Sequence, residues 1–428
     1  MLETAEKSPY VGRDGQPIAA GYPPQVKVLY LVSAYARDPA DLITPWLVET
    51  IRRLRGRGVE VEVLAPAFRG LRTQVVDGVR VHRFRYAPRG WETLTHEQTA
   101  PDRIRERPLY LTLVPGYVAA GSLAAARLAR RGGFDVVHAF WPLPHGLLGL
   151  AAQRAARVPL VSTFFGVELT WMEKELPFLA PVLRRIVRRS AAVTAISSYT
   201  AERLRRQVPS AQPVIIPFGA TVEPPAESPP PRQDPAAPFA LLFVGRLVER
   251  KGVHVLLDAL ATLPRERPLV LHVLGDGTER ARLEAQAAAL GLEGRVVFHG
   301  FVPAAELQRH LAACDAFVLP AVVDAKGDVE GLGVVLLEAM SYAKPTIASA
   351  AGGILDIVQD GRTGRLVPPG DVAALAAAIT KLMDDPALAQ ELGLHGREDV
   401  RTRFSWDVIV DRLVEVYRGV AGGAANRK

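Results

Sequence analysis

The sequence of 428 residues contains a single cysteine, Cys314, which lies in the apolar stretch Leu311–Leu319. One cysteine excludes an internal disulfide and a cysteine-based metal cluster, so we expect a buried thiol and a reducing cytoplasmic environment. Residues 1–25 are polar, contain Pro and Gly, and predict a loose tail in place of a signal peptide.

Several sequence signatures of enzyme classes are also missing. We find no Gly-x-Ser-x-Gly nucleophile elbow, no Walker loop and no Gly-x-Gly-x-x-Gly dinucleotide motif. Their absence argues against a serine hydrolase, a P-loop enzyme and a nicotinamide enzyme. A clean membrane span is missing as well, because the best candidate, Leu109–Ala126, is interrupted by Pro115, Gly116 and Gly121. We interpret it as a loop that leads into a helix.

The length of the chain indicates more than one domain, and the net charge differs between its two halves. A chain of this length predicts two or three domains. Residues 1–219 carry 30 Lys and Arg against 18 Asp and Glu, a net charge of +12, whereas the remaining residues carry 22 against 27. The basic half favours an anionic partner such as a membrane surface, and the alternative is an arginine-rich surface without a partner. No nucleic-acid-binding signature is present, so nucleic acid is not an expected partner.

Repeated strand and helix patterns predict an α/β fold with two Rossmann-like, doubly wound parallel-sheet domains facing across a cleft. Residues 220–238 are rich in proline and predict a stiff linker. We therefore expect a tail at 1–25, a first domain at 26–219, a second domain at 239–403, and a last helix in 404–428. The expected strands are Val26–Ser33, Val59–Leu64, an edge strand Arg80–Tyr86, Phe134–His138, Leu160–Phe164, Ala192–Ile196, Phe239–Val244, Leu269–Leu274, Val296–His299, Ala316–Leu319 and Thr346–Ala348.

The most informative motif lies between two glutamates, Glu330 and Glu338. It contains Gly331, Leu332, Gly333 and Val334, where a loop is expected to become a helix. A glycine-rich helix start offers free backbone N–H groups and the positive end of a helix dipole, which suits a phosphate. On a helix the two carboxylates would be roughly 12 Å apart. The alternative is an ordinary loop-to-helix junction.

A basic segment follows the first strand expected in the second half of the chain. Gly245 permits a tight turn after this strand, and Arg246 and Lys251 flank the loop that comes next. Two cations there would grip a diphosphate, Arg with a fork of donors and Lys as a point charge. Gly275 begins a further tight turn after a strand. The alternative is a surface loop with solvated charges.

Polar side chains at strand ends of the first half are candidates for chemistry. His138 ends one expected strand, and Glu168 follows another after the segment Thr163–Gly166. Both would lie at the carboxyl edge of the sheet, where ligands bind in such folds. A histidine at a strand end is more often structural than functional, so this alternative stays open for His138.

Taken together, these residues resemble glycosyltransferase family 4, the retaining transferases with the GT-B fold. The resemblance runs from about Val26 to Tyr417 and is strongest in the second half. It implies that the last helix, in 404–428, crosses back to the first domain. The motifs that match in order and spacing are Gly245-Arg246, Lys251-Gly252, Gly275–Gly277, Glu330–Glu338, Gly352–Ile354, Asp360–Gly364 and Val367–Gly370.

The resemblance implies a role for each matching residue. Arg246 and Lys251 would bind the donor diphosphate, and Glu330 would lie against the donor sugar. Backbone N–H groups of the Gly331–Val334 segment would contact sugar and phosphate, and Glu338 would hold the ribose. The donor would be a nucleotide-sugar, most simply a UDP- or GDP-sugar, with no required cofactor or metal. The acceptor would be a glycan or a lipid-linked molecule.

One departure from the family pattern affects the acceptor side. Many members have histidine where this chain has Phe165, so Glu168 or His138 would take over the missing polar contact, and we include both with Glu330 as catalytic candidates. The preferred hypothesis is a cytoplasmic glycosyltransferase at the inner face of the membrane, with 184–189 as a membrane contact. A nucleotide-sugar epimerase and a non-catalytic nucleotide-sugar binding module are the alternatives.

Overall fold

A computed structural model of the chain describes residues 26–41, 43–97, 100–220 and 237–425. The predicted tail and most of the predicted linker lie outside the described residues. The chain divides into two compact units, and each is described by itself. Unit 1 contains the described residues up to Ile196, Ala201–Ile216 and the residues from Ile409 onward, and unit 2 contains Ser197–Thr200 and Pro217–Val408. The domain ranges 26–219, 239–403 and 404–428 stay predictions.

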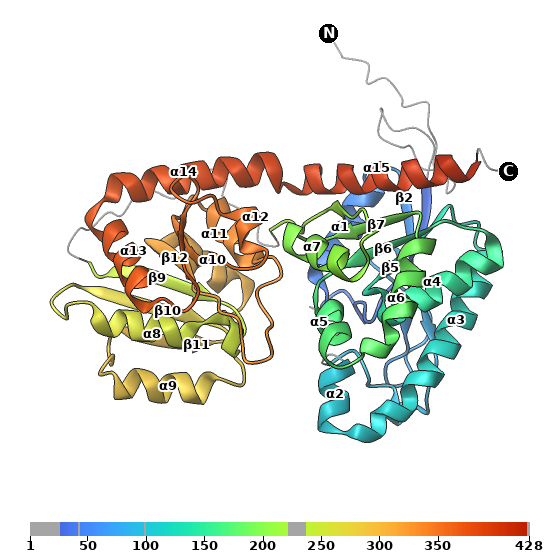
Figure 1. Ribbon diagram of the computed structural model, residues 1–428, viewed down its shortest axis with the longest axis horizontal. Helices are drawn as coiled ribbons and strands as arrows, with labels where there is room; N and C mark the ends of the chain where they lie inside the picture. The colour runs from blue at the N-terminus through green and yellow to red at the C-terminus, as the bar shows by residue number, and fades with distance from the viewer. Residues whose placement is uncertain (1–25, 42, 98–99, 221–236, 426–428) are drawn as a thin grey trace, which may run out of the picture. The chain divides into compact units, whose positions relative to one another are not determined.

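Unit 1 is built on a sheet with the strand order β3-β4-β2-β1-β5-β6-β7-β8. Figure 1 labels β2, β5, β6 and β7 of this sheet. All pairs are parallel except β3 with β4. The strands are β1 Val26–Leu31, β2 Val59–Pro66, β3 Gln74–Val76, β4 Val79–Phe84, β5 Val136–Phe140, β6 Leu160–Phe164, β7 Ala192–Ala195 and β8 Val214–Ile215.

The expectation of an edge strand at Arg80–Tyr86 is wrong, because β3 pairs with β4 and takes the edge position. The reason is a two-residue hairpin turn at Asp77 and Gly78, both of which have positive φ angles. An Asp-Gly pair favours this turn, since its twist matches that of the flanking strands.

The helices of unit 1 cover its sheet. They are α1 Pro45–Arg55, α2 Ala100–Glu106, α3 Val114–Arg131, α4 Pro142–Ala156, α5 Val167–Lys174, α6 Ala180–Arg189 and α7 Ser198–Gln207, with short 3₁₀ turns η1 Arg89–Trp91, η2 Pro108–Leu113 and η3 Pro177–Leu179. The helical stretch Pro108–Arg131 is long and apolar enough to cross a membrane by length and composition, which alone is weak evidence of a span.

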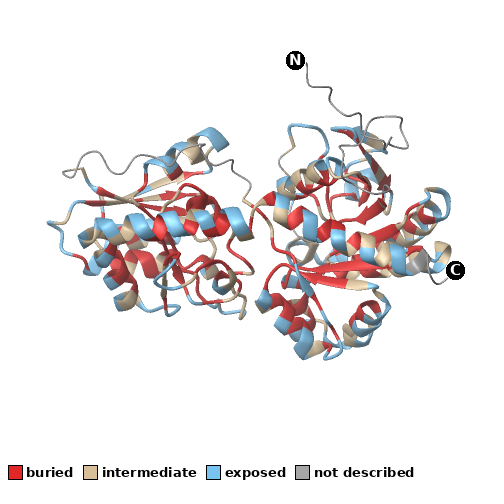
Figure 2. Ribbon diagram, turned by 90° about the horizontal axis from the view of Figure 1, so that it is seen from above, coloured by how far each residue is buried: buried red, intermediate tan, exposed pale blue. Residues whose placement is uncertain are grey.

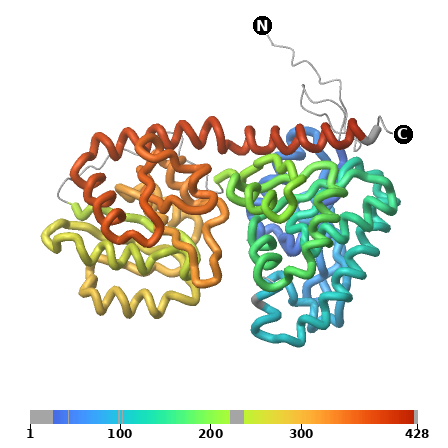
Figure 3. The backbone as a smooth tube through the Cα atoms, viewed as in Figure 1, coloured from blue at the N-terminus to red at the C-terminus, as the bar shows by residue number. Residues whose placement is uncertain are grey.

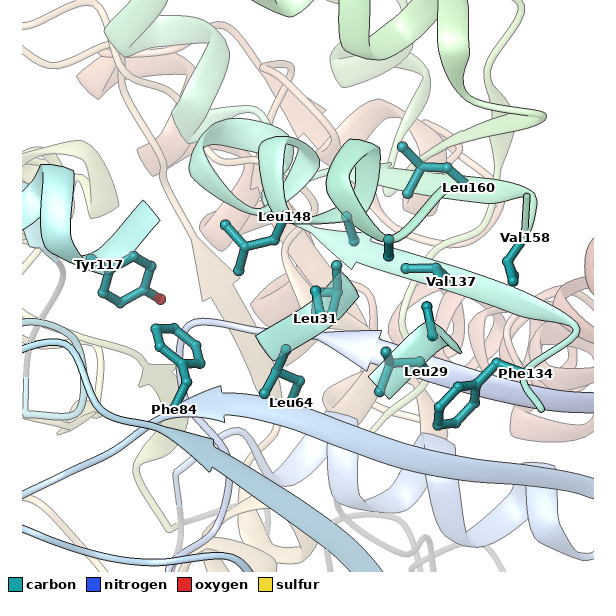
Figure 4. Packing of buried hydrophobic residues seen from close by; sticks show 14 of the residues in the cluster. Leu29, Leu31, Leu64, Phe84, Tyr117, Phe134, Val137, Leu148, Val158 and Leu160 are labelled. Carbon is teal, nitrogen blue, oxygen red and sulfur yellow. The ribbon is translucent and has the colours of Figure 1, made fainter. Parts of the chain in front are cut away.

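One face of α3 lies in the core of unit 1. Tyr117 packs edge-on against Phe84, and both belong to the apolar cluster that includes Leu148 of α4 (Figure 4). Gly121 of α3 faces Leu148 so closely that an added Cβ would lie 2.7 Å from a Leu148 methyl carbon. The small residues of α3 thus let two helices approach each other.

Unit 2 has a fully parallel sheet with the strand order β11-β10-β9-β12-β13-β14. The chain starts in the middle and winds outward in both directions, so the order reverses between β9 and β12. Ligands of doubly wound sheets bind beyond the carboxyl ends of the strands at such a reversal. The strands are β9 Phe239–Val244, β10 Leu269–Leu274, β11 Val296–Gly300, β12 Ala316–Leu319, β13 Thr346–Ser349 and β14 Arg365–Val367.

The central strands of both sheets are buried, whereas the edge strands β3, β8, β11 and β14 are partly or fully exposed. Many exposed residues lie on helices (Figure 2). Cys314 is buried as expected, and burial raises the pKa of its thiol to about 12. The helices of unit 2 are α8 Val253–Thr262, α9 Arg280–Ala289, α10 Ala304–Ala313, α11 Val334–Ser341, α12 Ile354–Ile357, α13 Val372–Asp384 and α14 Pro386–Arg403, with the 3₁₀ turn η4 Glu249–Lys251.

The last helix, α15 Trp406–Ala425, passes from one unit to the other. Trp406 donates from its indole nitrogen to the carbonyl of Ala220 at 2.7 Å, within unit 2. Figure 3 traces the backbone of this helix at the red end of the chain. From Ile409 onward the helix belongs to unit 1, where the Tyr417 hydroxyl lies 2.7 Å from that of Tyr30 on β1.

Candidate functional site

Four loops of unit 2 fit closely together at the carboxyl edge of its sheet. An added Cβ at Gly275 would lie 2.0 Å from the carbonyl oxygen of Gly245, and one at Gly252 would lie 1.7 Å from that of Pro320. Neither position can hold a side chain, because backbone occupies the space. These contacts join the loop after β9 to the loops after β10 and β12, and the Gly353 N–H donates to the Glu330 carbonyl at 3.0 Å.

Glu330 is held by two cations of the loop after β9. Its Oε2 accepts from Lys251 Nζ at 2.7 Å and from Arg250 at 2.8 Å. Glu330 and Lys251 are each 8% exposed. The structure thus brings together two predicted site residues that are far apart in the sequence, and it adds Arg250, which the sequence analysis did not select although it adjoins Lys251.

The charge state of Glu330 follows from these contacts. Burial acts to raise the pKa of its carboxyl group, but the charges and hydrogen bonds of Lys251 and Arg250 outweigh burial and lower this pKa below its ordinary value. Two cations face one carboxylate, so the cluster retains an excess positive charge. A buried excess cation beside a helix start is suited to a phosphate group.

The predicted loop-to-helix junction is present, and α11 begins at Val334 after Gly333, whose φ angle is +88°. Within the described part of the chain, the N–H groups of Gly331, Leu332, Gly333 and Val334 have no hydrogen-bond acceptor. The four donors are therefore available to a ligand at the positive end of the helix.

Two details of the predicted site need comment. Glu330 lies in the loop and Glu338 on α11, so the continuous helix on which the roughly 12 Å figure was based is not present; only the Val334–Glu338 segment contributes helical rise, about 6 Å. Glu338 is buried on α11. The Arg246 side chain is exposed and makes no hydrogen bond or ion pair with a described residue, so its predicted role in donor binding stays a prediction.

In unit 1, His138 lies in the interior on β5 and is 1% exposed. Its Nδ1 is 2.7 Å from the Tyr417 hydroxyl and its Nε2 is 2.6 Å from the Thr163 hydroxyl. Burial lowers the pKa of the imidazole to about 3, so the ring is neutral at physiological pH. Both ring nitrogens are occupied by protein partners, and a catalytic role for His138 stays a prediction that these contacts do not favour.

Glu168 begins α5 and is also buried, but its hydrogen bonding is incomplete. Its Oε1 accepts from the Phe165 N–H at 2.7 Å, whereas its Oε2 is buried without a partner among the described residues. Burial raises the pKa of the carboxyl group to about 7. A carboxyl group with this pKa can accept or donate a proton near neutral pH.

Aromatic rings gather at the same edge of unit 1, next to Glu168. Trp141 stacks on Phe165 with ring centroids 4.2 Å apart and planes inclined by 16°, and Trp46 lies 5.7 Å from Phe165. Trp141 follows β5 with a φ angle of +52°, which is rare for a bulky residue and costs energy. The sequence analysis did not select Trp46 or Trp141. For Trp141, the aromatic residue directly after a strand is the signal that it could have used, whereas Trp46 lies at the start of α1.

Comparison with known proteins places this geometry in a family. Residues 227–399 match the family described as "Glycosyl transferases group 1", and residues 43–219 match the "Glycosyl transferase 4-like domain". The chain is 34% identical over 307 residues to a GDP-mannose-dependent alpha-(1-6)-phosphatidylinositol monomannoside mannosyltransferase of Mycolicibacterium smegmatis, covering 69% of this chain and 80% of the relative. The chain belongs to the group 1 (family 4) glycosyltransferases.

Further relatives extend the likeness over nearly the whole chain. A phosphatidyl-myo-inositol mannosyltransferase of Mycobacterium leprae is 29% identical over 395 residues, covering 91% of this chain and 96% of the relative. The solved structure of sucrose-phosphate synthase from Thermosynechococcus elongatus has a TM-score of 0.72 at 24% identity, covering 93% and 100% of the two chains. The predicted family and GT-B fold are confirmed, and the glycosyltransferase is nucleotide-sugar-dependent as predicted.

Proposed function

We propose that this glycosyltransferase moves mannose from GDP-mannose to an anionic, inositol-containing lipid at the cytoplasmic face of the membrane, with retention of anomeric configuration. The donor and acceptor classes are supported by the two relatives described above, whose names specify GDP-mannose or phosphatidylinositol derivatives. The observation that carries the proposal is the Glu330–Lys251–Arg250 cluster beside four free N–H groups at the start of α11.

The cluster of Glu330, Lys251 and Arg250 would stabilise the diphosphate that leaves the donor sugar. The bond between the sugar C1 and the diphosphate oxygen breaks while a bond from the acceptor hydroxyl oxygen to C1 forms on the same face, and the acceptor proton passes to the leaving phosphate. Negative charge grows on the diphosphate, where the N–H groups and the excess cation stabilise it. Glu330 stays ionised and would lie against the sugar, held in place by Lys251 and Arg250.

The acceptor would occupy the aromatic edge of unit 1. The half-buried Trp46 and Trp141 offer apolar ring faces, which suit the C–H face of a sugar or cyclitol ring. The free Oε2 of Glu168 beside them would accept a hydrogen bond from an acceptor hydroxyl. Together these groups would replace the polar contact that Phe165 cannot make.

The test is a panel of radiolabelled donors offered with vesicles that contain phosphatidylinositol. We expect transfer from GDP-mannose to a lipid product, with the α-anomer identified by NMR of the released glycan. Transfer from UDP-glucose alone would overturn the proposed donor, and transfer only to a soluble glycan would overturn the proposed acceptor.

Membrane contact is proposed for α6. This helix buries Leu183, Ile186 and Val187 and exposes four arginines that form no ion pair within the described chain; they are Arg184, Arg185, Arg188 and Arg189. Phe178, just before the helix, is 71% exposed. Basic side chains near a membrane surface attract anionic lipids, each by about 1 kcal/mol.

Vesicle flotation tests the membrane contact. Arg184→Glu with Arg188→Glu should abolish binding to vesicles with anionic lipid, and added salt should weaken binding by the unmodified protein. The matched control is Arg282→Glu with Arg401→Glu, which reverses two charges on unit 2. Equal binding by both double variants would overturn the role of α6.

A further inference from the structure

Three histidines meet in unit 2, each from a different element. They are His272 on β10, His299 on β11 and His310 on α10. One ring nitrogen from each lies within 4.8 Å of the other two. His272 Nδ1 and His299 Nε2 are 2.9 Å apart, and the His299 and His310 ring centroids are 4.6 Å apart.

We propose that His272, His299 and His310 form a binding site for a divalent transition-metal ion of the zinc class. Zinc–nitrogen bonds of about 2.0–2.1 Å place two ligand nitrogens of a tetrahedral site about 3.3 Å apart. The His272–His299 pair already has nearly this spacing, and His310 completes the set by a side-chain movement of an ångström or so. Such movement is available because all three residues are half-buried.

Imidazole is a favoured ligand of zinc, and three such ligands leave one tetrahedral position for water or a carboxylate. Glu306 precedes His310 by one turn of α10, and its Oε1 lies 4.0 Å from His310 Nε2. Glu306 is therefore placed either to fill the fourth position or to hydrogen-bond a metal-bound water.

The backbone supplies a second, independent observation. The pairing of β10 with β11 shifts register after Val273, whose partner is Phe298, because Leu274 pairs with Gly300. His299 is the extra residue of this bulge. Bulges re-aim a side chain and occur next to functional sites. Here the bulge places the His299 ring against the rings of His272 and His310.

The metal would act as a structural clip between the edge strand β11, its neighbour β10 and the helix α10. Gly300, which follows His299, accepts a hydrogen bond from the Gly275 N–H at 2.7 Å. The site therefore supports the backbone that positions the Gly275 turn, which approaches the nucleotide-side loop at Gly245. This role is independent of the proposed donor and acceptor, and no step of sugar transfer passes through the metal.

The experiment uses the full chain without a polyhistidine tag, stripped with chelator and titrated with Zn²⁺ and with Co²⁺. We expect one Zn²⁺ per chain and an intense visible Co²⁺ spectrum typical of tetrahedral coordination. At Zn²⁺ concentrations a hundredfold above Kd, the Tm should rise by about 5 °C.

Variants locate the metal. His272→Gln and His310→Gln should each lower Zn²⁺ affinity by about tenfold or more, and His395→Gln, which changes an exposed histidine on α14, should not. Because His310 is only partly buried, its variant is expected to fold, as circular dichroism can verify. No stoichiometric Zn²⁺ binding, or equal affinity in all three variants, would overturn the proposal.

Discussion

At the scale of single residues, the clearest prediction concerns Glu330 of unit 2. Its carboxylate is the only negative charge in contact with Lys251 and Arg250 among the described ion pairs. The neutral variant Glu330→Gln would leave both cations without their carboxylate. It would also remove the group proposed to lie against the donor sugar.

We predict that Glu330→Gln lowers kcat by about 100-fold, the scale on which a positioned polar group acts in a transition state. Steady-state kinetics with the best donor measures it. The control is Glu266→Gln, an exposed carboxylate before β10, which should retain full activity. A Glu330→Gln enzyme with unchanged kcat would contradict the role of this residue.

Glu168 gives a second prediction at this scale, because its folded pKa of about 7 exceeds the ordinary value of 4.5. Between these values the folded state binds more protons than the unfolded state, so its contribution to stability is present below pH 4.5 and is lost as pH rises through 7. We predict that Glu168→Gln raises the free energy of unfolding by about 2 kcal/mol at pH 8 and changes this free energy little at pH 5.

Urea unfolding at the two pH values measures this difference. An equal effect at both pH values would show that folding does not raise the pKa of this carboxyl group.

At the scale of helices and strands, the sequence predicted the bounds of strands better than the contacts between segments. The bounds of β6, β9, β10 and β12 agree with prediction because each is a short apolar run bounded by turn residues or a helix signal. The hairpin of β3 and β4 was missed although an Asp-Gly pair marked it. The pairing of Lys251 with Glu330 could not be predicted, since it depends on loops that meet only when β9 and β12 become neighbours.

The same limit applies to α15, because the resemblance implied that this helix crosses back to the first domain but did not identify the residues that it contacts there. In the structure the Tyr417 hydroxyl contacts both the Tyr30 hydroxyl and His138 Nδ1, at 2.7 Å each. All three groups are buried. Removal of the Tyr417 hydroxyl would leave two buried polar groups without this partner, which is costlier than the loss of one exposed hydrogen bond.

We predict that Tyr417→Phe destabilises unit 1 by about 2 kcal/mol and increases hydrogen exchange in α15. Tyr30→Phe should cost less, because it leaves the contact between Tyr417 and His138. The double variant should cost less than the sum of the single variants, since both remove the same hydrogen bond. Strict additivity in urea unfolding would contradict a shared network.

For the whole molecule, the pKa values of the buried groups predict that acidification destabilises unit 1 before unit 2. Three buried histidines lie there: burial lowers the pKa of His96 and His138 to about 3 and that of His145 to about 4. Each has a folded pKa below the ordinary value of 6.5, so the unfolded state binds more protons between these values. The stability they provide is therefore present above pH 6.5 and falls with pH, by about 2 kcal/mol for each histidine at pH 5.

Glu168 opposes this loss in part, because its raised pKa favours the folded state on acidification. The three histidines outweigh one carboxyl group, so we predict that the urea midpoint of unit 1 falls between pH 7.5 and pH 5. Four of the five tryptophans, Trp46, Trp91, Trp141 and Trp171, lie in unit 1, so tryptophan fluorescence reports mainly on it. Hydrogen exchange with mass spectrometry follows unit 2 in the same samples, and earlier acid unfolding of unit 2 would show that the buried histidines do not control acid stability.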